Sequence, residues 1–499
     1  MNAAAPPART GTRRREGALA IVLHTHMPYV EGFGTWPFGE EWLWEAMVGC
    51  YVPLLALLER GVPVTLSLTP VLGDQLEADG VPARFASFVR ELRADTHARD
   101  AAELRARGEE PLARELERAW GDYEGALERL QERGGDLLAL LGRHASWTSS
   151  ATHAILPLLA SEAGLALQLR SGIASHRRRF GAWAGGLWIP ECAYAPWLEE
   201  GLHAAGVRSS CIELSGALEP GRWEHLRPLA TESGLVLAPV DRATMALVWS
   251  AQGYPAAGAY RDYHRLSTHH HNPWSNSGAA YDHGAALAQA RAHATEFVAR
   301  TKGRLRTAAA QAGGGLPDGG LVVCALDTEL LGHWWYEGLD WLGAVVEECS
   351  RQDLELLTME DALARAQPWE LAGAPAARPP AALAQAVSDW RASSWGEGWD
   401  LSTWSAPVVA ELAFGPRAAE LDLLRAGAEA SPAAVRELLA LQSSDWAFLL
   451  TRALAGSYPR ERFDGHLGAL RRALSDGGAT EELERNIAPD AHVSMLLAP

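Results

Sequence analysis

Several short apolar segments of this chain end abruptly in polar residues and alternate with helix-like segments. The apolar segment 18–23 runs into His24 and His26, a helical pattern covers 40–60, and a second apolar segment covers 62–68. Apolar segments resume near Trp147 and continue at 186–190, 206–213, 235–240 and 321–326. Because strand, helix and strand follow one another in this way, the pattern predicts a parallel β/α barrel or sheet.

The polar ends of these predicted strands are the candidate functional residues. In parallel barrels the active site lies at the carboxyl ends of the strands. Glu191 or Asp327 alone could be only a helix N-cap. Two such carboxylates across one barrel mouth are what glycosyl transfer needs, because one attacks the anomeric carbon and the other protonates the leaving oxygen. The strand ends carry His24 and His26, residues 148–153, Glu191, and Asp327 with Glu329 and His333.

The remaining segments have simpler patterns. Residues 1–17 read as a disordered leader and 74–146 as a helical insertion with Glu and Arg at i,i+4 spacing. The Gly-rich stretch 303–320 predicts a surface loop, and the Ala/Pro-rich stretch 372–382 predicts a linker. Beyond it the chain is mostly helical to its end.

Composition excludes several classes of protein. The net charge of −18 argues against a nucleic-acid partner, since phosphate binding needs a basic surface. The sequence contains no apolar run of about 18 residues or more, so we predict no membrane span. The five cysteines are scattered and odd in number, which favours reduced thiols and a cytoplasmic location. The 20 tryptophans favour a carbohydrate ligand only weakly, because indoles also fill cores.

Histidines and tryptophans near the strand ends allow more than one interpretation. His24 and His26 face the same way on a strand and could bind a metal, a carboxylate or sugar hydroxyls. No third metal ligand stands at a supporting spacing, so we predict no metal and no cofactor. Residues 269–271, three histidines in a row, read as a polar loop. His333 and Trp334 follow Asp327 closely enough to line one pocket, but one of Trp334 and Trp335 is expected to pack in the core.

On the basis of these residues, the chain resembles glycoside hydrolase family 57, and within it the 1,4-α-glucan branching enzymes. The resemblance covers residues 18–454 and rests on five blocks in order. They are HTHMP (24–28), WTSSATH (147–153), WIPECAY (188–194), ALDTELLGHWW (325–335) and SSDW (443–446).

The resemblance implies an α/β fold, an incomplete (β/α)7 barrel with a helical insertion and an all-α C-terminal domain. The barrel would occupy residues 18–371, with the insertion at 74–146, and the helical domain, 372–499, would close over the cleft. The implied partner is an α-glucan, on which the enzyme cleaves an α-1,4 bond and re-forms it as an α-1,6 branch.

The resemblance also assigns roles to residues. Glu191 would be the nucleophile and Asp327 the general acid/base of a retaining mechanism. The remaining block residues and two C-terminal tryptophans would bind substrate, with Trp274 added as a candidate aromatic near the cleft. The implied binding residues are His24, His26, His153, Trp188, His333, Trp334, Trp274, Trp395, Trp404 and Asp445.

One stretch departs from the family. Branching enzymes of this kind carry a mobile loop with a tyrosine over the cleft, whereas the corresponding stretch here, 231–241, has no aromatic residue. Water could then compete better for the glycosyl-enzyme. An α-glucan hydrolase or 4-α-glucanotransferase on the same site is therefore an alternative to branching. The alternatives from other classes are a metal-dependent polysaccharide hydrolase and a non-catalytic glucan-binding protein.

Overall fold

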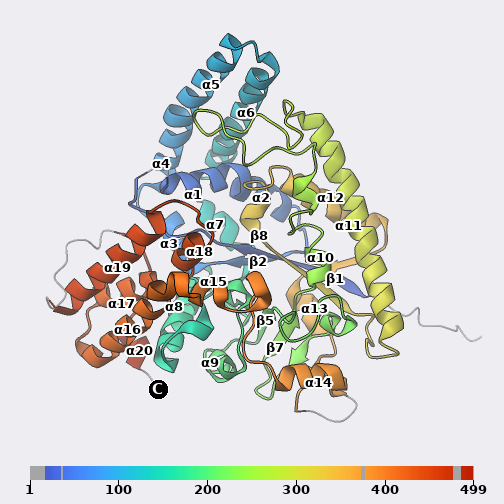
Figure 1. Cartoon of the computed structure of the whole chain (residues 1–499), viewed down its shortest axis with the longest axis vertical. Helices are drawn as coiled ribbons and strands as arrows, with labels where there is room; N and C mark the ends of the chain where they lie inside the picture. The colour runs from blue at the N-terminus through green and yellow to red at the C-terminus, as the bar shows by residue number, and fades with distance from the viewer. Residues whose placement is uncertain (1–16, 35–37, 373–376, 476–484, 498–499) are drawn as a thin grey trace, which may run out of the picture.

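The computed structural model describes residues 17–34, 38–372, 377–475 and 485–497 (Figure 1). The predicted leader, 1–17, lies outside the described residues except for Gly17, and part of the predicted linker, 373–376, also lies outside them. The proposed division of the chain into a leader, a barrel with an insertion and a C-terminal domain stays a prediction.

A parallel sheet forms the centre of the molecule. Its order is β4-β3-β2-β1-β8, with β9 also pairing with the first residues of β1. Both faces of β1 are buried, which explains its nearly continuous apolar sequence. The strands are β1 (Ala18–Thr25), β2 (Thr65–Leu68), β3 (Ala145–Ser149), β4 (Leu187–Trp188), β8 (Leu321–Asp327) and β9 (Glu355–Leu357).

A second sheet continues the first and bends it into a barrel. Its order is β10-β6-β7-β5, where β5 (Ser209–Ile212) and β7 (Val236–Pro239) are parallel. A bridge from Gly186 to Ser209 joins β4 to β5, and the Asp241 N–H donates to the Val323 carbonyl of β8 at 2.8 Å. The predicted incomplete parallel β/α barrel is confirmed. The short strands β6 (Leu229–Ala230) and β10 (Trp369–Glu370) lie outside this circuit.

Helices follow the strands and cover the sheet (Figure 1). In α12 the buried residues Leu339, Leu342, Val345 and Cys349 recur at helical spacing, so one stripe of the helix packs inward. The covering helices are α1 (Glu40–Ala46), α2 (Val52–Leu58), α8 (Glu162–Phe180), α9 (Glu199–Ala204), α10 (Arg242–Met245), α11 (His283–Gln311), α12 (Gly338–Arg351) and α13 (Met359–Arg365).

Helix α11 corrects one prediction. It runs to Gln311, so residues 303–311 of the predicted loop 303–320 are helical. Leu305 and Ala308 of this stretch are buried. Their burial outweighs the cost of one mid-helix glycine, Gly303, which is about 1 kcal/mol.

Between β2 and β3 the described chain is helical. Helices α5 and α6 project from the body as a pair (Figure 1). This segment contains α3 (Pro70–Glu77), α4 (Val81–Ser87), α5 (Ala94–Ala106), α6 (Glu110–Glu132) and α7 (Leu137–Gly142).

The C-terminal part is helical, and most of its helices gather at one side of the barrel (Figure 1). The Arg462 guanidinium of α19 is buried and donates to the Tyr29 carbonyl at 3.1 Å, which ties these helices to the loop after β1. The helices are α14 (Ala381–Ser388), α15 (Ser402–Ser405), α16 (Ala410–Ala426), α17 (Pro432–Leu441), α18 (Asp445–Thr451), α19 (Tyr458–Ser475) and α20 (Val493–Leu497).

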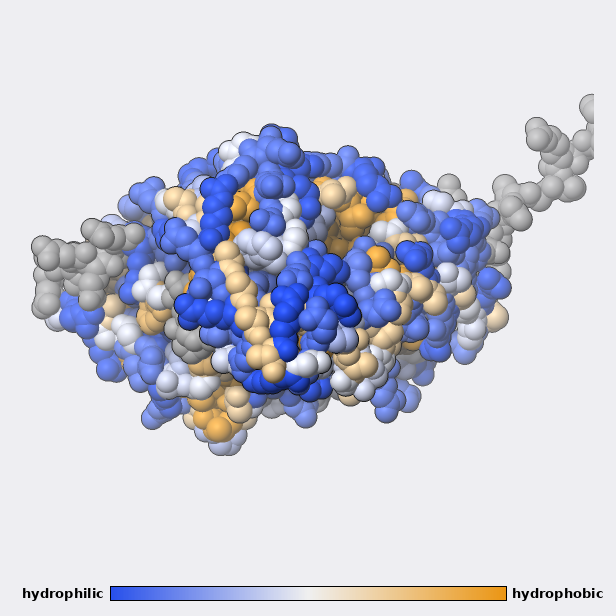
Figure 2. All heavy atoms as spheres, turned by 90° about the horizontal axis from the view of Figure 1, so that it is seen from above, coloured by the Kyte–Doolittle hydropathy of each residue, from blue (hydrophilic) through white to orange (hydrophobic). Residues whose placement is uncertain are grey.

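One helical stretch, Glu40–Leu58, is long and apolar enough to cross a membrane by length and composition. Most of it is buried inside the protein, as is typical of a core helix. In the face seen from above, hydrophilic residues cover most of the surface and hydrophobic residues lie between them in small separate patches (Figure 2).

Candidate active site

The ends of β1 and β8 bring together the first predicted site residues. In the register of the sheet, His24 lies opposite Asp327 on one side and Ser67 on the other. All three strands are parallel, so their carboxyl ends open at the same edge. The structure therefore places His24 and Asp327 side by side, although they come from opposite parts of the chain.

Glu191 follows β4 and stands in an unusual backbone conformation. Its φ is 59°, in the left-handed region, where a non-glycine residue costs about 1–3 kcal/mol. Trp395 stabilises this conformation of Glu191 with two hydrogen bonds. The Trp395 N–H donates to the Glu191 carbonyl at 2.9 Å, and its indole Nε1–H donates to the Glu191 carboxylate Oε2 at 2.6 Å. His153 and Cys192 also have positive φ. Strain of this kind gathers at functional sites, where surrounding contacts maintain it.

Both predicted carboxylates have a raised pKa, and the charge of Asp327 acts on Glu191. Burial raises the pKa of Glu191, and the negative charge of Asp327 raises it further. Burial also raises the pKa of Asp327, with the charge of Glu329 adding to it. The Trp395 hydrogen bond acts in the opposite direction and stabilises ionised Glu191. Because the charge of Asp327 opposes ionisation of Glu191, we expect the pair to hold one proton near neutral pH.

Three histidines line the same space. His24 Nε2 lies 2.9 Å from His153 Nε2, and His26 Nε2–H donates to Asp445 Oδ1 at 3.0 Å. His153 Nδ1 lies 2.8 Å from the Ser444 hydroxyl and 3.9 Å from Glu191 Oε1. Burial lowers the pKa of His24 and of His153, so both rings are neutral at pH 7 and each offers one donor and one acceptor. Neutral imidazoles can therefore form hydrogen bonds with sugar hydroxyls, which also donate and accept.

His26, His153 and Asp445 could be considered as metal ligands, because their ligand atoms lie within 4.8 Å of one another. The ring geometry does not fit. The His26 and His153 rings stack with centroids 4.0 Å apart and planes 19° apart. A bound metal lies in the plane of each imidazole, and two stacked, nearly parallel rings direct their lone pairs side by side rather than to one point. The arrangement favours a hydrogen-bonding cluster.

The C-terminal helices complete this cluster. Asp445 opens α18, and Ser444 precedes it, so both enter the site from a segment about 290 positions after His153. The sequence prediction named Asp445 but missed Ser444, which stands in the same SSDW block. It also gave no role to Tyr51. The Tyr51 hydroxyl donates to Glu329 Oε1 at 2.7 Å, and Glu329 accepts the His26 N–H at 3.0 Å.

The predicted tryptophans differ in exposure. Trp188 is buried beneath the cluster, with its ring 4.6 Å from that of His24 and 5.0 Å from that of Trp395. Trp404 is only 2% exposed and packs against Gly396. The expectation that Trp404 offers a face to a sugar is therefore not met in this structure, where it supports the loop that carries Trp395.

The interpretation of Trp274 as an aromatic near the cleft is wrong. Trp274 is buried with Ala101, Leu104 and Leu116, so it packs against the projecting helices α5 and α6. The neighbouring histidine loop, 269–271, is fastened to the same helices. Asp100 accepts hydrogen bonds from the His269 ring at 2.6 Å and from its N–H at 3.1 Å.

The two tryptophans in the loop after Asp327 differ in burial, as expected. Trp335 is 1% exposed and lies in the core, whereas Trp334 is 40% exposed. His333 is half-buried, and its ring lies 5.9 Å from that of Tyr263. Among the contacts of the described residues, none joins His333 directly to either carboxylate.

The stretch 231–241, taken from the sequence as the counterpart of a lid loop, is not a lid. It contains the turn before β7 and β7 itself, Val236–Pro239. The loops that follow β7 instead carry the aromatic side chains Trp249 and Tyr263, both more than a third exposed. The prediction failed because it assigned strand β7 to the loop that follows this strand.

Glu213 and Arg242 are functional candidates that the sequence did not reveal. Arg242 donates to the fully buried Glu213 Oε2 at 2.6 Å, and also contacts the Trp395 carbonyl at 3.5 Å. The Ser393 hydroxyl donates to the Glu213 carbonyl. This ion pair thus supports the segment from which Trp395 reaches Glu191. Its only sequence signal is that Glu213 and Arg242 stand at the carboxyl ends of β5 and β7.

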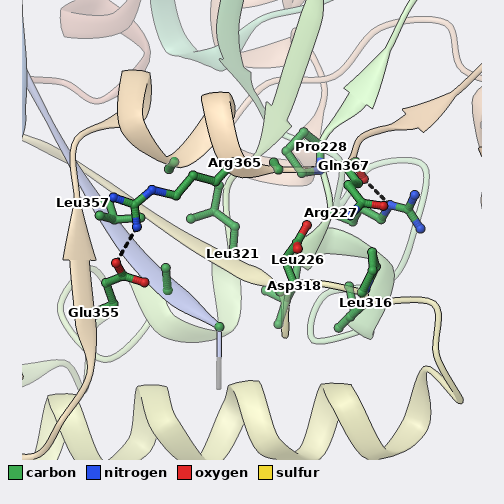
Figure 3. Close-up of a pocket in the computed structure, with 16 residues that line it drawn as sticks. Leu226, Arg227, Pro228, Leu316, Asp318, Leu321, Glu355, Leu357, Arg365 and Gln367 are labelled. Atoms are coloured by element: carbon green, nitrogen blue, oxygen red, sulfur yellow. Dashed lines mark hydrogen bonds and ion pairs between the residues drawn. The ribbon is translucent and has the colours of Figure 1, made fainter. Parts of the chain in front are cut away.

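A separate pocket lies at the opposite ends of the strands, where β8 begins (Figure 3). Its two arginines pair with Glu355 and with backbone carbonyls. Arg365 pairs with Glu355, and Arg227 donates to the Gly315 carbonyl at 2.9 Å and to the Gln367 carbonyl. It contains none of the predicted site residues.

Comparison with known proteins gives consistent matches. Residues 142–375 match the family model for glycosyl hydrolase family 57, and residues 420–490 match the model for the C-terminal region of 1,4-α-glucan branching enzymes. A probable 1,4-α-glucan branching enzyme of Mycobacterium tuberculosis is 31% identical, over 91% of this chain and 91% of that protein.

Two archaeal branching enzymes are also similar. The 1,4-α-glucan branching enzyme of Thermococcus kodakarensis is 29% identical over 92% of this chain and 74% of that protein. The crystal structure of the branching enzyme of Pyrococcus horikoshii superposes with a TM-score of 0.84 at 28% identity, covering 96% of this chain and 97% of the other.

Proposed function

Since this chain belongs to glycosyl hydrolase family 57, and within it to the 1,4-α-glucan branching enzymes, we propose that it forms α-1,6 branches on α-glucan through a glycosyl-enzyme on Glu191. The observation that supports this mechanism best is the pair of carboxyls at the barrel mouth. Glu191 is held by the Trp395 indole, and Asp327 is close enough for its charge to raise the pKa of Glu191.

In the first step Glu191 attacks the anomeric carbon, and Asp327 gives its proton to the departing O-4 of the α-1,4 link. The carbon–O-4 bond breaks as the bond to the Glu191 oxygen forms. Burial raises the pKa of Asp327 to about 7, so a proton is available near neutral pH, and the reactive form of the pair is the one in which Asp327 carries it. The indole N–H of Trp395 lowers the pKa of Glu191, against the effect of burial, and fixes the position of its carboxylate.

In the second step Asp327 removes the proton from a 6-hydroxyl of an acceptor chain. That oxygen attacks the anomeric carbon, and the Glu191 carboxylate leaves. Two inversions at the same carbon restore the α configuration. His24, His26 and His153 surround this position with neutral or carboxylate-paired donors, and we propose that they orient the sugar hydroxyls.

The reaction is tested by incubating the enzyme with amylose and following the products by proton NMR. We expect new α-1,6 anomeric signals to exceed new reducing ends several-fold. A hydrolase would give reducing ends without branches. A 4-α-glucanotransferase would redistribute chain lengths and give neither. Either result would overturn the proposal of branching.

Trp395 offers a test of the state of the nucleophile. The variant Trp395→Phe loses the donor that lowers the pKa of Glu191, so that pKa rises. Because Glu191 must be ionised to attack, the acidic limb of the pH–rate profile should move to higher pH. We expect kcat to fall roughly 10- to 100-fold, as for loss of a hydrogen bond to a charged group. Steady-state rates on amylose between pH 4 and 9 measure both the position of the acidic limb and the fall in kcat.

Trp390→Phe is the matched control. It also removes an indole N–H bond in this region, but that bond is to the Ser393 hydroxyl at 3.1 Å. An unmoved acidic limb in Trp395→Phe, or the same shift in Trp390→Phe, would contradict the role of Trp395.

We also propose a cytoplasmic location, because all five cysteines are free and buried. Thiols in this state suit a reducing compartment.

A further inference from the structure

Helix α16, one of the C-terminal helices, leaves large apolar side chains in water (Figure 1). Its buried face, with Leu412 and Leu423, packs into the core. On the other face Phe414 and Leu421 are 62% and 42% exposed, and Val408, in the turn before the helix, is 68% exposed. Single exposed apolar residues are common, but several on one helix face mark a surface that another molecule covers.

The exposed positions of α16 recur at alternating intervals of three and four residues. The exposed stripe consists of Glu411, Phe414, Ala418, Leu421 and Arg425. Residues at this spacing lie along one side of a helix, and two helices that carry them pack side by side as in a coiled coil. The small side chain of Ala418 in the middle allows close approach. Arg417 flanks the stripe, with its guanidinium carbon 5.8 Å from the centre of the Phe414 ring.

The exposed stripe is complementary to a second copy of itself that runs in the opposite direction. Phe414 and Leu421 stand four and three positions from Ala418, and Glu411 and Arg425 each stand seven positions from it. With a two-fold axis at Ala418, each Phe414 faces Leu421 of the second copy and each Glu411 faces Arg425. A symmetric dimer needs such a self-complementary surface. A parallel arrangement would instead place like charges against each other.

The charged residues at the two ends of the stripe are available for this contact. Glu411 pairs with Arg460 of α19, and Arg425 pairs with Asp422 of its own helix. All four side chains are exposed, so these ion pairs contribute little to the stability of a single chain. Glu411 and Arg425 can therefore turn to the second copy at small cost.

We propose that the exposed stripe of α16 is the interface of a symmetric dimer, in which two copies of this chain pack antiparallel along α16. The stripe is about 21 Å long, from 14 helical steps. A contact along one helix is at the small end of specific interfaces, about 1,200 Å² in total, so we expect a dissociation constant in the micromolar range. The dimer is an addition to the proposed function and does not depend on it.

Sedimentation equilibrium of the full chain between about 1 and 100 µM measures the association. We expect the average mass to rise with concentration from 53.7 kDa towards twice that value. Phe414→Glu places a carboxylate in each apolar contact and should stay monomeric. Leu266→Glu is the matched control, because Leu266 is 48% exposed and lies beside Ser267, which is bonded to α5, far from α16 (Figure 1).

A charge exchange tests the antiparallel register. Glu411→Arg alone places arginines against each other at both ends of the stripe, and Arg425→Glu alone does the same with glutamates. Each should weaken association roughly tenfold, since facing like charges repel. The double variant restores opposite charges and should recover the association. An equimolar mixture of the two single variants should recover it as well, because each then faces its complement.

A mass of 53.7 kDa at every concentration would overturn the dimer. So would association that Phe414→Glu leaves unchanged, or an equal loss in Leu266→Glu. Failure of the double variant to recover association would overturn the antiparallel contact. Circular dichroism verifies that each variant is folded. Because mass rather than turnover is measured, these results are independent of the amylose experiment.

Discussion

Replacing Glu191 with alanine should lower the rate of transfer from amylose by roughly 10⁴-fold or more, the scale of loss when a covalent nucleophile is removed. Azide should restore part of the rate on a maltooligosyl fluoride, because the small anion fits where the carboxylate stood. Azide would attack from the face that Glu191 occupies. One inversion then converts the α-fluoride into a β-glycosyl azide, which NMR identifies by its anomeric coupling.

The control for Glu191→Ala is Glu200→Ala, which removes an exposed carboxylate a few residues further along the chain. It should keep full activity. Substantial transfer by Glu191→Ala without azide, or formation of the α-glycosyl azide, would contradict the role of Glu191 as nucleophile.

Stability distinguishes a chemical defect from unfolding. The pKa of Glu191 is raised to about 8 in the folded protein, above its value in the unfolded chain. The stability linked to its proton is present at pH 4 and is lost as the pH rises towards 8. Glu191→Gln cannot ionise, so its melting temperature should equal or exceed that of the unchanged protein at pH 8. The difference should narrow towards pH 4.

Replacing Asp327 with asparagine should slow transfer from amylose by roughly 10²- to 10⁴-fold, the range for loss of a general acid. Asparagine cannot protonate the departing O-4. A fluoride leaving group needs little protonation, so release of fluoride from a maltooligosyl fluoride in the first step should fall far less. Burst kinetics with this donor measure the first step separately from transfer.

Two further observations test Asp327. In Asp327→Ala, azide should intercept the glycosyl-enzyme and give the α-glycosyl azide, the opposite anomer to that expected for Glu191→Ala. Asp353→Asn makes the same chemical change at an exposed loop position and should be silent. Equal losses with amylose and with the fluoride would show that Asp327 does not act as the acid.

Much of the fold and of the site chemistry could be predicted from local sequence. Buried parallel strands need uninterrupted apolar runs, and the residue after each run must stand at the same edge of the sheet. That single rule located His24, Glu191 and Asp327 from the order of apolar and polar residues alone. The same rule indicated the barrel, because strand and helix patterns alternate.

Other assignments failed where local pattern is ambiguous. Trp274 lies in a polar loop and reads as a surface aromatic, but α5 and α6 supply apolar partners far away in sequence. Trp404 is buried for the same reason, by packing that no local pattern records. Helix α11 continued past Gly303 because Leu305 and Ala308 had a core to pack against.

The sequence by itself determined which residue types stand at the strand ends, and so which chemistry the barrel mouth can perform. Only the tertiary structure decided that Trp395 donates to Glu191, that Asp445 and Ser444 reach the histidines, and that Trp249 joins Trp334. The reason is physical. Strand ends follow from short-range burial, whereas these contacts join segments whose approach depends on how separate elements pack against one another.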